Sequence, residues 1–74
     1  MTLAAGDTLT IEVLEDASLN RTVAVLPDGR FSFPFAGALQ AGGRTLAVVA
    51  EEVGLLQDLL NPELGGLMCE AKLG

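Results

Sequence analysis

Apolar and polar residues alternate along the first third of the chain, a pattern typical of half-buried strands. In the segment 8–13, the apolar positions are Leu9, Ile11 and Val13. Side chains in a strand point alternately to opposite faces, so these three share one face. The alternation resumes over 21–25, after a polar, turn-rich segment, with its valines facing inward. The pattern predicts two strands joined by a loop.

A strong turn signal, Pro27-Asp28-Gly29, follows the second predicted strand. Proline presets the first turn position, aspartate bonds the backbone beyond it, and glycine accepts the left-handed conformation. This combination predicts a hairpin into a third strand. We expect the three aromatic residues of the chain to lie on one face of that strand, at the centre of the core: Phe31, Phe33 and Phe35.

Two residues limit this third strand. Pro34 cannot donate a ladder hydrogen bond, which predicts an edge strand or a bend at that point. Gly37 is expected to mark the bend, and 38–41 reads as a short extended piece that ends at Gly42-Gly43.

After Gly43 the hydrophobic period changes from two to between three and four. Thr45 is a suitable N-cap, and Pro62 disfavours helix in the residue before it, so we predict a helix that ends near Asn61. Its inward stripe is formed by the apolar residues at helical spacing: Leu46, Val49, Val53, Leu56 and Leu60.

A second apolar stripe, Val48, Leu55 and Leu59, falls roughly opposite the first, while Glu51 and Asp58 share a solvated side. Two interpretations stay open. The stripe consists of scattered exposed aliphatic residues, or it is a surface covered by another subunit.

The chain closes with another alternating segment, in which Leu67, Cys69, Ala71 and Leu73 share a face and Cys69 points inward. Short strands followed by one helix and a last strand predict an α+β fold: a small mixed or antiparallel sheet with one amphipathic helix packed across it. We expect a single domain over residues 3–74.

Composition narrows the function. The chain has 74 residues and a net charge of −6, with only four basic residues, which form no basic patch for nucleic acid. It has no His, Trp or Tyr, and its single cysteine cannot close an intrachain disulfide. No apolar run approaches the roughly 18 residues of a membrane span.

Catalytic and metal chemistry lack their usual residue sets. Cys69 has no histidine to act as its base, and the adjacent acids Glu15 and Asp16 read as a solvated loop. Neither the acidic residues nor Gly42-Gly43 match the spacing of a calcium loop or a phosphate-binding loop. We therefore expect no catalytic residue, no cofactor and no metal.

Order and spacing across the whole chain resemble a known family. The segment from Leu3 through Gly6-Asp7 to Val13 resembles its "GD-x-L-x-I-x-V" strand. The segment 23–37 resembles its "V-x-V-x-x-DG-x-I-x-x-P-x-x-G", and Asn61-Pro62 resembles its "NP" step. The chain is similar to the periplasmic domain of the outer-membrane polysaccharide biosynthesis and export family. It departs from the family pattern over 65–69.

The resemblance implies a non-enzymatic role in a periplasmic and outer-membrane conduit for capsular polysaccharide or exopolysaccharide. It implies homo-oligomeric rings, polysaccharide as the transported cargo, and an inner-membrane chain-length or export partner protein. In this reading, six residues are architectural: Gly6, Asp7, Asp28, Gly29, Pro34 and Gly37. The second apolar stripe becomes the candidate subunit interface.

The family's acylated N-terminal cysteine, β-grasp domains and membrane-crossing helix have no counterpart in this sequence, which also shows no signal peptide. We therefore expect the chain to be part of a longer protein. The alternative function is a stand-alone adaptor or small-ligand-binding module that uses the same fold, with a protein strand or small ligand bound along the Pro34 edge.

Overall fold

The computed structural model describes residues 2–74 and shows an α+β fold, as predicted. Five strands and one α-helix occur in this range, together with two short 3₁₀ turns, η1 (Ala17–Leu19) and η2 (Pro62–Leu64). The strands and helix are β1 (Thr8–Val13), β2 (Arg21–Ala24), β3 (Arg30–Phe33), β4 (Gly37–Gln40), α1 (Leu46–Leu60) and β5 (Cys69–Leu73).

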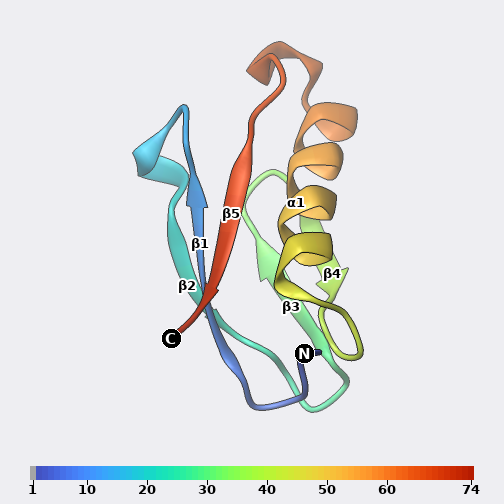
Figure 1. Cartoon of the computed structure of the whole chain (residues 1–74). Helices are drawn as coiled ribbons and strands as arrows, with labels where there is room; N and C mark the ends of the chain where they lie inside the picture. Colours follow the sequence, from blue (N-terminus) through green and yellow to red (C-terminus); the bar gives the residue numbers. More distant parts are fainter. Residues whose placement is uncertain (1) are drawn as a thin grey trace.

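The strands form two small antiparallel sheets instead of one. The first has the order β2-β1-β5, so β1 lies at its centre, with Leu9 opposite both Val23 and Leu73. The second is the β3–β4 pair, in which Phe31 lies opposite Leu39. Figure 1 shows α1 running alongside β5, with β3 and β4 behind it.

Both sheets and the helix share one hydrophobic core. The inward residues of β1 are almost completely buried, as are Phe31 and Phe33 of β3 and Val49 and Val53 of α1. Burial of one such side chain stabilises the fold by about 1.5–3 kcal/mol. The alternating apolar residues of β1 and the helically spaced apolar residues of α1 therefore pack into the same core.

The helix begins and ends where the sequence predicts. The Thr45 hydroxyl accepts a hydrogen bond from the Val48 N–H at 3.3 Å, and the Asn61 N–H donates to the Gln57 carbonyl at 2.9 Å. Gly54 allows the helix to lie close to the segment before β5, because a Cβ at this position would lie 3.0 Å from the Leu67 carbonyl oxygen.

The predicted inward stripe is wrong at its last position, since Leu60 is 60% exposed. The buried residue of the last turns is Gln57, whose side-chain amide donates to the Pro34 carbonyl at 3.1 Å. Asn61 donates to the Phe35 carbonyl at 2.7 Å. At this end the helix meets backbone carbonyls instead of apolar side chains, so Leu60 is left in solvent.

The expectation that all three aromatic rings lie in the core is wrong for Phe35, which is 51% exposed. Pro34 begins a tight turn in which the Ala36 N–H donates to the Phe33 carbonyl at 3.1 Å. Phe35 takes a left-handed φ of 63° there. The turn interrupts the alternation, so the third ring leaves the face shared by the first two.

The Pro27-Asp28-Gly29 turn forms, but it does not join two strands of one sheet. The Gly29 N–H donates to the Leu26 carbonyl at 2.8 Å, and the Asp28 carboxylate accepts from the Arg30 N–H at 3.0 Å. Because β2 and β3 belong to different sheets, the turn carries the chain from one sheet to the other.

Gly29→Val tests the energetic role of this turn. Gly29 has a φ of 82°, and a Cβ there would lie 2.9 Å from the Gln40 side-chain nitrogen. We expect the substitution to lower the free energy of unfolding by about 1 kcal/mol or more, measured by chemical denaturation. Gly43→Val is the matched control, because Gly43 has a φ of 79° but an added Cβ meets nothing within 4 Å. An unchanged free energy of unfolding in Gly29→Val would contradict the left-handed turn at Gly29, and a similar loss in Gly43→Val would assign the effect to the backbone conformation.

Candidate functional site

The outer face of α1, defined by Val48, Leu55 and Leu59, is exposed in the structure. Their exposed fractions are 41%, 58% and 77%, whereas Val49 and Val53 on the opposite side are buried. These three large aliphatic side chains lie along one exposed strip of the helix. The structure thus makes this stripe available for contact with a partner.

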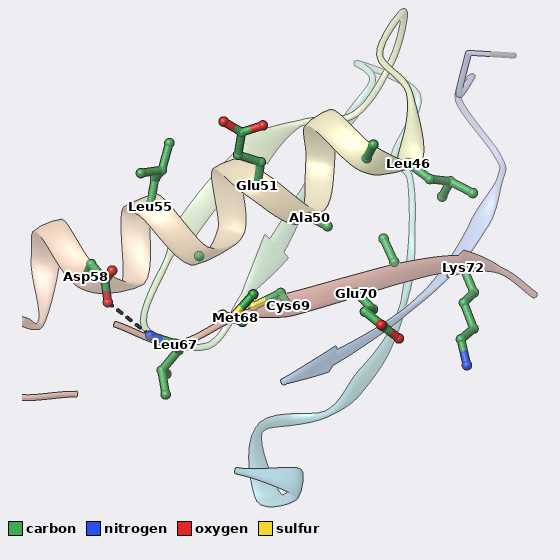
Figure 2. Close-up of a pocket in the computed structure, with 13 residues that line it drawn as sticks. Leu46, Ala50, Glu51, Leu55, Asp58, Leu67, Met68, Cys69, Glu70 and Lys72 are labelled. Carbon is green, nitrogen blue, oxygen red and sulfur yellow. Dashed lines mark hydrogen bonds between the residues drawn. The ribbon is translucent and has the colours of Figure 1, made fainter. Parts of the chain in front are cut away.

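An open groove of about 650 Å³ lies between α1 and β5 (Figure 2). The helix contributes small residues, Ala47, Ala50 and Gly54, and the strand side contributes Leu67 and Ala71. Small helix side chains leave this space open next to the strand. The groove was not predicted from the sequence, although small residues at helical spacing, Ala47, Ala50 and Gly54, were its signal.

Two carboxylates hold the segment that leads into β5. Asp58 accepts a hydrogen bond from the Leu67 N–H at 3.2 Å (Figure 2) and another from the Gly66 N–H at 2.9 Å. Glu15 accepts from the Met68 N–H at 2.8 Å. Asp58, predicted to be simply solvated, therefore fixes the wall of the groove.

Cys69 is half-buried and faces the helix. Its thiol lies 3.5 Å from the side-chain oxygen of Gln57, to which it donates. Burial raises the pKa of the Cys69 thiol, and the negative charges of Glu15 and Asp58 raise it further. A thiol held in its protonated form is a poor nucleophile. The arrangement favours a structural cysteine.

The six predicted architectural residues lie in or beside turns. Asp7 accepts a hydrogen bond from the Ala4 N–H at 2.9 Å and follows Gly6, whose φ is 91°. Asp28 and Gly29 form the turn between the two sheets. Pro34 opens the β3–β4 turn, and Gly37, with a φ of 77°, begins β4. Two backbone hydrogen bonds join the Gly6–Asp7 turn to Val25, just before the Asp28–Gly29 turn, whereas the β3–β4 turn lies at the other end of β3.

Charged side chains pair locally. Lys72 of β5 lies 2.7 Å from the Glu12 carboxylate of β1, which raises the Lys72 pKa through their hydrogen bond, and Arg44 pairs with Glu52. Among residues 2–74, no group of three or more Cys, Asp or Glu side chains is placed to hold a metal ion. The same residues include no helix long and apolar enough to span a membrane.

Comparison with known families decides the identity. A model of the polysaccharide biosynthesis/export protein family matches residues 1–62. The chain belongs to this family. The resemblance noted in the sequence is thereby confirmed, and polysaccharide export is the process in which the family takes part. No curated protein matches the chain.

The family match covers the elements from β1 through α1 and ends at Pro62. Strand β5 follows the matched segment, yet it pairs with β1 along its whole length. The family match therefore includes β1 to β4 and α1, while the groove beside β5 is formed partly by residues beyond the match.

The raised pKa of Cys69 has a measurable consequence. We expect the pH midpoint of its alkylation by iodoacetamide to lie above that of cysteine in the urea-unfolded chain. Glu15→Gln keeps an acceptor for the Met68 N–H and removes one negative charge, so it should move the midpoint toward the unfolded value. A folded-state midpoint below the unfolded one would contradict this assignment.

Proposed function

We propose that the chain is a structural, non-catalytic subunit of a conduit that exports capsular polysaccharide or exopolysaccharide across the periplasm and outer membrane. Membership of the polysaccharide export family supports the process. The protonated, half-buried Cys69 thiol supports the absence of nucleophilic catalysis. In this proposal the turns and the core hold the domain in shape as part of the conduit wall, and no residue catalyses a chemical reaction.

The exposed outer face of α1 is the observation that carries the proposal of assembly. A domain of this size has a small core, and association adds apolar burial that the monomer lacks. Val48, Leu55 and Leu59 present that surface on a rigid helix. We propose that copies of the protein associate head to tail into a ring around the transported polymer, with this face of one copy packed against a different surface of the next. An inner-membrane partner delivers the polymer.

Sedimentation velocity on the native protein that carries this domain tests the assembly. We expect species larger than a monomer, and we expect Val48→Asp with Leu59→Asp to shift them toward monomer, because charges at a buried apolar contact are unfavourable. Leu26→Asp is the matched control, since Leu26 is an exposed leucine outside α1. Monomers alone over a wide concentration range would rule out the ring and favour the adaptor function.

Export itself is tested in the cells that encode the protein. Deletion of its gene should remove polysaccharide from the cell surface while polymer accumulates inside, because synthesis continues without a conduit. Restoration of surface polysaccharide by the wild-type gene and by Leu26→Asp, but not by the α1 double variant, is the expected pattern. Unchanged surface polysaccharide in the deletion strain would contradict the proposal.

A further inference from the structure

Strand β5 lies at an edge of the three-stranded sheet, and its outer side is open. Two hydrogen bonds mark the ladder with β1: the Leu14 N–H donates to the Met68 carbonyl at 2.9 Å, and the Gly74 N–H donates to the Thr8 carbonyl at 3.0 Å. In an antiparallel ladder, alternate residues bond to the neighbour. The backbone groups of Cys69 and Ala71 therefore point away from β1.

These outward groups border the groove between β5 and α1. Cys69 and Ala71 both line it, and no strand of residues 2–74 pairs with β5 on that side. Adjacent strands lie about 4.8 Å apart, so an added strand would run beside β5, along the groove wall that α1 provides. The groove thus combines an open strand edge with an apolar wall, as in recognition by strand addition.

The alternation of side chains along β5 determines which way the side chains of an added strand would point. Cys69 and Ala71 are half-buried and face α1, whereas Glu70 and Lys72 are exposed on the other face. An added strand continues this alternation, so every second side chain would contact the apolar wall. The side chains between them would lie beside Glu70.

The charge of the groove favours a basic segment. Its lining includes Glu51, Asp58 and Glu70 but one cation, Lys72, and that cation is paired with Glu12. In the register of the sheet, Glu70 lies directly opposite Glu12, and the nearby Lys72 is paired with Glu12. A lysine or arginine on the added strand would balance Glu70.

Three alternating apolar segments of the described chain carry a cation. Residues 21–24 form β2, which is paired with β1, and residues 30–33 form β3, which is paired with β4. Strand β5 carries Lys72 beside Glu70, so β5 of a second copy would bring no net positive charge to the groove. We propose that the groove between α1 and β5 binds an extended segment of a different protein, with apolar residues at alternate positions and Lys or Arg between them, as a fourth strand on β5.

Peptide selection tests this docking site. Nonapeptides selected from a random phage-displayed library on the folded chain should alternate apolar residues with Lys or Arg. The enriched peptide, once synthesised, should shift the amide NMR signals of Cys69 and Ala71 on titration into ¹⁵N-labelled protein. Its affinity should fall with rising salt.

Ala71→Pro isolates the strand edge. The Ala71 N–H points outward, so proline at this edge position removes one donor to the added strand and leaves the β1 ladder intact. We expect binding of the selected peptide to weaken at least tenfold, whereas Ala71→Ser, which keeps the N–H, should bind like the wild type. Equal affinities for the two folded variants, no enriched sequence, or enrichment of acidic peptides would each overturn the proposal.

Backbone methylation of the peptide gives the same test without changing the protein. N-methyl groups on the peptide edge that faces β5 should abolish binding, and those on the opposite edge should not; equal effects would refute strand addition. Val48→Asp with Leu59→Asp lies outside the groove and should leave peptide binding unchanged. Failure of the docking site and failure of self-association are therefore distinguishable.

Discussion

The pairing of β1 with β5 is the contact on which the rest of the structure depends. It joins residues 9–13 to residues 69–73 and so closes nearly the whole chain into one loop. The entropic cost of closing a loop rises only slowly with its length. Burial of Leu9, Ile11 and Val13 on the inner face of β1 offsets this cost. Because β5 is held there, α1 lies beside it, and the groove forms between them.

Local patterns predicted most of the fold. Alternation identified β1, and the Thr45 cap with Pro62 placed both ends of α1. Phe35 and Leu60 were placed wrongly because their exposure depends on how the 34–36 turn meets the end of the helix. The division into two sheets was missed for a similar reason, since a turn signal does not specify whether its flanking strands pair.

The candidate surfaces differ in how far sequence could predict them. Helical spacing alone identified the outer face of α1, with Leu59 the most exposed of its three residues. Prediction of the groove requires the register in which β5 pairs with β1, and no local sequence pattern specifies such a long-range pairing. One side of α1 would thus serve assembly and the adjoining side would receive a strand, with Leu55 at the boundary between them.

Site-directed labelling at position 59 tests the central claim, that the outer face of α1 is buried in a working export assembly. In a Cys69→Ala background, Leu59→Cys is treated with a maleimide, both in exporting cells and as dilute purified protein. Protection in the cells and full reaction in dilute solution are predicted, with Leu26→Cys reactive in both. Equal labelling of Leu59→Cys in the two settings would contradict the account.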